Sequence, residues 1–333
     1  MIETPRERFR MTTTPVLDRP SISADDPAVR DANRRAKREA RSRRGPLLPA
    51  LIFTIVVTQL PFVVTLIFSF RRYNTNHPER YGWAGFNNYK RAFTDPTIRK
   101  DMLNTVELVV VVVLVSLVLG MCIALLLNQR FWGRGAVRTM MIAPFLIVPT
   151  AAALFWKFGM FDPNTGLING VFTTVHRWFA GQAASASAVD IIGPHPLLAV
   201  QMQLIWQWTP FMTLILLAGL QSRPADVLEA AAVDGASGWQ MFVSLTLPHM
   251  RQYLELAGLL GAIYILQNFD TVFVLTPLNP QTENLPNLIY QTIFSSNDNG
   301  LASAQGVIIV IGTIFIATFA LRTVSSLFKE ENS

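Results

Sequence analysis

Six long apolar stretches divide the sequence, and they constrain its fold more than any other feature. They run over residues 47–70, 105–127, 139–158, 197–220, 253–275 and 302–321. A helix needs about 20 apolar residues to cross the hydrocarbon core of a bilayer. β-branched runs such as Val109–Val113 would suit a strand in water, but in lipid a helix satisfies its own backbone hydrogen bonds. The sequence therefore predicts an all-α membrane protein with about six transmembrane helices.

Composition favours the membrane class over a soluble one. Only 15% of the residues are charged and 51% are hydrophobic, whereas a soluble domain has roughly 25% charged residues. The single cysteine, Cys122, allows no disulfide within the chain, and the four scattered histidines show no ligand spacing. We therefore expect the chain to bind no metal and no cofactor.

Positive charge is concentrated before the first apolar stretch. The formal net charge is +6, and much of the excess lies in the run Arg34–Arg44. A basic cluster at this place fits contact with anionic lipid headgroups on the cytoplasmic side, and it argues against a nucleic-acid partner. We predict a disordered, basic cytoplasmic tail over residues 1–46, with Met11 as an alternative start.

An even number of helices places both termini on one side of the membrane. With the N-terminus inside, the inner segments hold about 19 of the 28 Lys and Arg residues, in agreement with the positive-inside rule. The outer loop 71–103 is also basic, which conflicts with that rule. Because the dense block before the first helix should dominate, we predict a multi-pass protein with both termini in the cytoplasm.

The inner segment 221–250 predicts two short helices joined by a sharp turn. Ser222 is a cap residue, Pro224 suits a first helical turn, and Ala230–Ala232 are strong helix formers. Gly235 can take a positive φ and end the first helix. Trp239, Phe242 and Leu245 recur at a spacing of three as an apolar stripe, and Pro248 is expected to end the second helix.

Two interpretations of this segment follow from its pattern. Its bare alanine face and apolar stripe suit insertion into a groove on a cytoplasmic partner. An amphipathic helix that lies on the membrane surface would show the same pattern.

The residues of this segment resemble a known motif. Glu229-Ala230-Ala231, Asp234-Gly235-Ala236 and Leu245-Thr246-Leu247-Pro248 look like the EAA loop of ABC importer permeases. In that family the loop docks into the ATP-binding subunit and couples ATP hydrolysis to helix movement. The resemblance thus implies a type I importer permease fold, with coupling residues Glu229, Ala230, Ala231, Asp234, Gly235 and Pro248.

Other segments resemble the carbohydrate branch of these permeases, the MalF/UgpA-like proteins. They include Phe86-Asn87-Asn88-Tyr89, Asn104-Thr105 and Leu217-Ala218-Gly219-Leu220-Gln221. The resemblance covers residues 47–328 as a permease domain with its coupling loop at 221–250, and leaves 329–333 as a cytoplasmic end. Thr276-Pro277-Leu278-Asn279-Pro280 departs from the family's Thr-x-Gly-Gly-Pro, in an outer loop expected to face the binding protein.

The sequence contains no Gly-x-x-x-x-Gly-Lys-Ser/Thr run that would cradle ATP phosphates. The chain is therefore not expected to be an enzyme. The resemblance implies that ATP and Mg²⁺ bind a partner ATPase dimer. It also implies a second homologous permease, an extracytoplasmic solute-binding protein and a place in the bacterial inner membrane.

Polar and aromatic side chains in the fourth and fifth apolar stretches suggest a substrate site, because such groups are costly in lipid. By their offset from Glu229, several positions resemble those that line the sugar site of the family. Interhelical hydrogen bonding is the alternative for the amide side chains. The candidate residues are Trp208, Phe211, Gly261, Tyr264, Gln267 and Asn268.

The run from Asn284-Leu285-Pro286 to Gly306-Val307 looks most like permeases for sugar alcohols such as sorbitol and mannitol. A disaccharide such as trehalose or maltose is the alternative. An ion-driven secondary transporter or a channel is an alternative of another class, but it would favour buried mid-helix carboxylates or an inverted repeat, and neither stands out.

Overall fold

The computed structural model describes residues 47–180 and 190–330. The predicted basic tail 1–46 and residues 331–333 lie outside these ranges. The chain divides into two compact units, residues 1–62 and 63–333, and each is described by itself. In the first unit, the described residues form the beginning of helix α2, Leu47–Ser69. Thr54 and Thr58 there bond the carbonyls of Ala50 and Thr54, one turn earlier, so their hydroxyls are satisfied within the helix.

In its described residues, the second unit has helices and one short ribbon, which confirms the all-α class. The ribbon pairs β1, Arg71–Arg72, with β2, Gly82–Trp83, in antiparallel register. The other elements, in chain order, are η1 (Pro78–Arg80), α3 (Asn87–Thr94), α4 (Pro96–Asn128), α5 (Arg134–Leu146), α6 (Pro149–Leu154), η2 (Phe155–Met160), α7 (Leu167–Ala180), α8 (Pro196–Gln221), α9 (Ala225–Val233), α10 (Gly238–Met241), η3 (Phe242–Thr246), α11 (Leu247–Leu266), α12 (Asp270–Leu275), α13 (Leu285–Phe294) and α14 (Asn299–Glu330).

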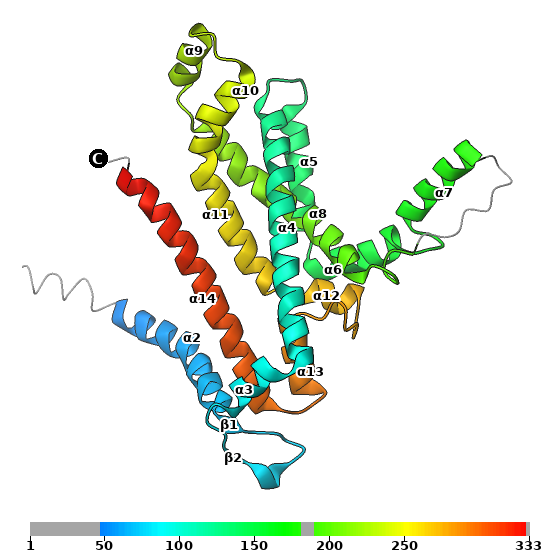
Figure 1. Ribbon diagram of the computed structural model, residues 1–333, viewed down its shortest axis with the longest axis vertical. Coiled ribbons are helices and arrows are strands. Elements are labelled where there is room, and N and C mark those ends of the chain that lie inside the picture. Colours follow the sequence, from blue (N-terminus) through cyan, green and yellow to red (C-terminus); the bar gives the residue numbers. More distant parts are fainter. Residues whose placement is uncertain (1–46, 181–189, 331–333) are drawn as a thin grey trace, which may run out of the picture. The chain divides into compact units, whose positions relative to one another are not determined.

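The core lies where α4, α8 and α11 pack together (Figure 1). Leu108, Leu204 and Met212 are almost fully buried there. Two glycines allow the backbones to approach closely. A Cβ on Gly120 would lie 3.2 Å from the backbone nitrogen of Thr213, and one on Gly261 would collide with the methyl group of Met212.

The predicted number of six spans is not confirmed. Within the described residues, α2, α4 and α8 are long and apolar enough to cross a membrane, and the α5–α6–η2 pair adds a fourth span if its 95° bend is counted as one. The fifth predicted stretch, 253–275, is not one helix, because α11 ends at Leu266 and α12 begins at Asp270. In the sixth stretch, the apolar part of α14 is defined over Asn299–Phe315 alone, the continuous run of residues whose side chains the structure describes.

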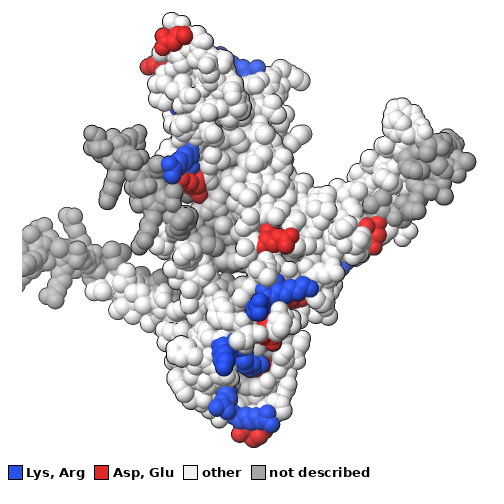
Figure 2. All heavy atoms as spheres, viewed as in Figure 1, with Lys and Arg blue, Asp and Glu red and all other residues white. Residues whose placement is uncertain are grey.

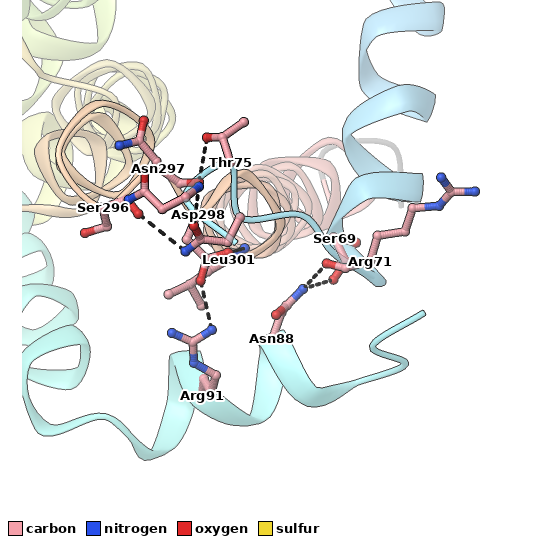
Figure 3. A network of polar contacts seen from close by, with 11 residues as sticks. Ser69, Arg71, Thr75, Asn88, Arg91, Ser296, Asn297, Asp298 and Leu301 are labelled. Carbon is pink, nitrogen blue, oxygen red and sulfur yellow. Dashed lines mark hydrogen bonds and ion pairs between the residues drawn. The ribbon is translucent and has the colours of Figure 1, made fainter. Parts of the chain in front are cut away.

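One end of the unit is held by a polar network that joins distant parts of the chain (Figure 3). Asn88 donates to the carbonyls of Ser69 and Arg71 at 2.9 and 2.8 Å. Arg91 forms an ion pair of 2.9 Å with Asp298. Gly300 lies directly against the Arg71 carbonyl, where a Cβ would not fit. The turn before α14 is therefore fixed to α3 and β1.

Charged side chains gather towards two ends of this unit. On the face drawn in Figure 2, they lie near α9 and α10 and over the half of the unit that carries β1 and β2, with few on the part between. A surface poor in charge between two charged ends is what a bilayer requires.

Candidate functional site

The segment between α8 and α11 forms the helical elbow that the sequence predicts. The helix α9 ends in a Schellman motif, because Ala236 N–H donates to the Ala231 carbonyl and Gly235 N–H to the Ala232 carbonyl. Gly235 has a φ of +82°, which confirms the left-handed conformation expected of it. Asp234 is the last residue before this turn. A capping box between Ser237 and Gln240 then starts α10.

The elbow presents an exposed surface of apolar side chains and one carboxylate, which we call the coupling surface and define by Glu229, Ala230, Val233 and Trp239. No residue of α9 is buried. Val233 is 88% exposed and Trp239 is 73% exposed, and the Trp239 ring stacks on Phe242 at 5.8 Å. Exposed apolar patches of this kind mark interaction sites. The elbow lies at one end of the unit, away from the β1–β2 ribbon (Figure 1).

Two details of the predicted elbow are wrong. Pro248 does not end the second helix, because it lies in the first turn of α11, which continues directly from η3. A π-turn over Phe242–Thr246 lets Leu247 N–H donate to the Phe242 carbonyl, and a wider turn is one way to accommodate a proline within a helix. Ser222 does not cap α9, since it ends α8.

The two arms of the elbow are tied together at its base. The Ser222 hydroxyl bonds the Tyr253 hydroxyl at 2.7 Å and His249 Nε2 at 3.2 Å. The Arg223 guanidinium donates to the Leu220 carbonyl and to the Thr246 hydroxyl, and burial lowers the pKa of Arg223. The end of α8 is therefore held against η3 and the start of α11.

Three of the predicted substrate residues lie together in an aromatic cluster. The Trp208 ring stacks on Tyr264 at 5.3 Å and meets Phe211 edge-on at 5.7 Å. Phe145 of α5 completes the cluster by stacking on Phe211 at 5.0 Å. Tyr264 remains 56% exposed, so one aromatic face is open. Phe145 was not predicted, because nothing in its apolar stretch distinguishes it.

Two other predicted residues lie elsewhere. Gly261 is a buried residue of α11 that lies against Met212 of α8 and Val113 of α4, where its missing side chain permits close packing. Gln267 is exposed and lines an apolar groove of about 740 Å³ with Phe269, Tyr290 and Phe294. The structure therefore separates both residues from the aromatic cluster.

Asn268 lies in the break between α11 and α12, one helical turn beyond Tyr264. Its backbone carbonyl accepts a hydrogen bond of 2.7 Å from Asn284 Nδ2. Its own side-chain oxygen, Oδ1, is buried and has no hydrogen-bond partner among the described residues. A buried acceptor without a partner is costly, so this oxygen needs a donor that the described residues do not supply.

The α11–α12 break is joined to the α5–α6 break. Thr150 donates to Asp270 Oδ1 at 2.9 Å, and Lys157 Nζ donates to the Val274 carbonyl at 2.8 Å. The Ile147 carbonyl at the α5–α6 break accepts from Gln207 Nε2 at 3.1 Å. Gln207 thus has the interhelical role that was the alternative for the amide side chains. No cluster of three or more His, Cys, Asp and Glu able to hold a metal ion occurs in residues 47–180 and 190–330.

Comparison with known proteins agrees with this architecture. Residues 116–329 match the family model described as the binding-protein-dependent transport system inner membrane component. The chain is 31% identical to the trehalose transport system permease protein SugA of Mycobacterium tuberculosis, over 86% of this chain and 92% of the relative. It is 32% identical to the trehalose/maltose transport system permease protein MalF of Thermococcus litoralis, over 81% and 89%.

A solved structure has the same fold. It belongs to a bacterial ABC transporter involved in the import of the acidic polysaccharide alginate, and it superposes with a TM-score of 0.71 at 21% identity, over 86% of this chain and 98% of that one. The family match, with which the exposed elbow and the charge-poor surface agree, shows where this chain belongs. It is one of the inner-membrane components of binding-protein-dependent transport systems, the permease subunits of ABC importers.

Proposed function

We propose that this permease carries a carbohydrate into the cell by alternating access, driven by a separate ATPase. The relatives SugA and MalF are named for trehalose and maltose transport, and the chain resembles the carbohydrate branch over most of its length. The substrate site comprises Trp208, Phe211 and Tyr264 with Phe145, and Asn268 beyond them.

The observation that carries this proposal is the pairing of an aromatic surface with an unsatisfied acceptor. Sugars present C–H faces that pack on aromatic rings and hydroxyls that donate to oxygen acceptors. The exposed ring of Tyr264 supplies the aromatic surface, and Asn268 Oδ1 supplies the oxygen acceptor. Neither α8 nor α11 carries a Lys or Arg near these residues, which disfavours a phosphorylated solute. Gln267 and Gly261 are the weaker members of the predicted set.

Two substrate classes have specific support. The pattern from Asn284 to Val307 favours a sugar alcohol such as sorbitol or mannitol, and the names of the relatives favour a disaccharide such as trehalose or maltose. Both present several neighbouring hydroxyls.

The coupling surface is proposed to receive the ATPase. ATP and Mg²⁺ would bind that subunit, with a second permease beside this chain and a solute-binding protein on the outer side. A solved relative of the same fold is a transporter in complex with an alginate-bound periplasmic protein. Both termini would then be cytoplasmic.

Uptake of labelled sorbitol, mannitol, trehalose and maltose in a strain without the gene tests both parts of the proposal. Wild type should restore uptake of one of them. Gly235→Asp should not, because a side chain at a φ of +82° is strained and a new carboxylate on this surface must be desolvated on docking. Equal uptake with wild type and Gly235→Asp would reject the coupling surface.

Asn268→Leu tests the substrate site separately. The variant should assemble normally and raise the KM for uptake, because it removes the acceptor and keeps the side-chain volume. Gln267→Leu, measured beside it, decides whether that neighbouring amide belongs to the site. An unchanged KM in Asn268→Leu would remove Asn268 from the proposal.

A further inference from the structure

Two asparagines at the start of α13 donate hydrogen bonds to the backbone of the break that contains Asn268. Where a helix stops, its last carbonyls lose their helical partners and must be satisfied in another way. Asn284 Nδ2 donates to the carbonyl of Asn268 at 2.7 Å, and Asn287 Nδ2 donates to the carbonyl of Phe269 at 3.1 Å. Two consecutive carbonyls of the break thus accept from side-chain amides at the start of α13, and the Phe269 carbonyl also accepts from Phe273 N–H at 3.1 Å.

Burial and hydrogen bonds between Asn284 and Asn287 fix the orientation of these two side-chain amides. Asn284 is 1% exposed and Asn287 is 4% exposed. Asn284 Oδ1 accepts from both the backbone N–H and the side-chain amide of Asn287, at 3.3 and 2.8 Å. Because its oxygen is committed to capping α13, the amide nitrogen of Asn284 is directed at the Asn268 carbonyl.

The start of α13 is in turn anchored on α4. Asn104 Nδ2 donates to the Glu283 carbonyl at 3.0 Å, and Leu285 N–H donates to the Thr105 hydroxyl at 2.9 Å. Both bonds hold the start of α13 on α4, and the Leu285–Thr105 bond remains when Asn104 is replaced.

We propose that Asn284 and Asn287 are positioning residues for substrate selection, an inference that rests on the proposed function of Asn268. By satisfying the main-chain oxygen of Asn268, Asn284 leaves the side-chain Oδ1 as the unoccupied acceptor at this residue. Without that amide, the Asn268 carbonyl would compete for the same donors, and the break would relax. The predicted consequence is weaker binding of the carbohydrate in an otherwise assembled transporter.

The test is Asn284→Ser in the complete transporter, with its partner subunits, reconstituted in vesicles. Serine keeps the oxygen that caps α13, but it has no amide to reach Asn268. We expect the KM for labelled trehalose or sorbitol to rise about tenfold, the size of one net hydrogen bond. Basal ATP hydrolysis should stay unchanged, because the elbow is not altered. Asn287→Leu, which removes the second donor, should act in the same direction and serves if Asn284→Ser does not assemble.

Asn104→Leu is the matched control. It removes a buried amide-to-carbonyl bond of similar length to the same segment, but that bond does not involve the break. It should lower the stability of the complex and leave KM unchanged. The double variant with Asn268→Leu should be no worse in KM than Asn268→Leu alone, because Asn284 acts through Asn268.

Hydrogen exchange of residues 266–270 separates this inference from the proposed function. Asn284→Ser should speed exchange there, and Asn104→Leu should not. Faster exchange together with a raised KM supports the inference. Faster exchange with no change in uptake of either carbohydrate supports the positioning role and rejects the proposed substrate site. Unchanged exchange in an assembled Asn284→Ser transporter overturns the positioning role, as does an additive KM effect with Asn268→Leu.

Discussion

At the residue scale, Leu278 is the clearest exception to local backbone preference. It has a φ of +56° and is 74% exposed, at a position where the family pattern has glycine. Leu278→Gly should stabilise the protein by about 1 kcal/mol, because a left-handed backbone costs a side-chain-bearing residue roughly that amount. The midpoint of thermal unfolding of the purified complex measures it.

Asn297→Gly is the matched control for this change. Asn297 also has a positive φ, of +53°, but asparagine tolerates that region well, so its gain should be smaller. If Leu278→Gly lowers the midpoint, the exposed leucine makes a stabilising contact that outweighs its backbone strain.

Glu283, in the loop before α13, predicts a pH dependence of stability. Burial raises the pKa of this carboxyl, and a hydrogen bond from Gln291 opposes the shift. A carboxyl whose pKa is raised in the fold contributes most below its unfolded pKa, and that contribution is lost as pH rises through the folded value. Glu283→Gln should therefore match wild type near pH 4 and exceed it in unfolding midpoint at pH 8. A difference that does not vary with pH would contradict this.

The roles of individual amide residues in the site could not be predicted from the sequence. Gln207 and Asn268 are both amides in apolar surroundings, and nothing in the sequence separates them. The structure does, because the Gln207 amide faces the Ile147 carbonyl while Asn268 Oδ1 has no partner among the described residues. That distinction depends on where two helices break. Asn284 had a usable signal, since an asparagine two residues before Pro286 is typical of a helix cap.

At the scale of elements, prolines had opposite effects that the sequence did not separate. Pro149 starts α6 after a sharp bend, whereas Pro248 lies in a continuous helical run behind a π-turn. A proline removes one donor in either case. Whether the chain bends or widens its turn depends on the packing around it.

Gln207→Leu should destabilise the bend between α5 and α6. It leaves the Ile147 carbonyl without its side-chain donor, at a cost of about 1–3 kcal/mol. Gln203→Leu is the control, because among the described residues Gln203 bonds only Gln207 and the bond to Ile147 remains. The expected result is a lower unfolding midpoint for Gln207→Leu than for Gln203→Leu. Equal midpoints would mean that another group can satisfy Ile147.

At the scale of the whole molecule, the membrane class and the coupling elbow were predictable from sequence. Both depend on patterns local to one stretch, namely apolar length and the spacing from Glu229 to Pro248. The number of spans was not predictable in the same way, because the bend at Ile147 and the break at Asn268 are fixed by contacts between distant helices. The predicted domain boundaries remain a prediction.

Glu229→Lys tests whether the coupling surface holds the ATPase. Reversing a charge on this exposed surface should abolish copurification of the ATPase with the permease, because like-charge contacts and desolvation oppose docking. Glu79→Lys reverses an exposed charge in η1, near the opposite end of the unit, and should leave copurification intact. Retention of the ATPase by Glu229→Lys would place the docking site elsewhere.

The network at the β1–β2 end also has a consequence for biosynthesis. Its ion pair joins residues 207 positions apart, and its bonds from Asn74 and Thr75 reach 222 positions along the chain. At roughly 5–20 residues per second, a ribosome needs about 10–40 s to make the partner of Arg91. Until then Arg91 and Asn74 lack these partners. A nascent chain that stalls before Asp298 therefore lacks the partner that Arg91 has in the finished chain.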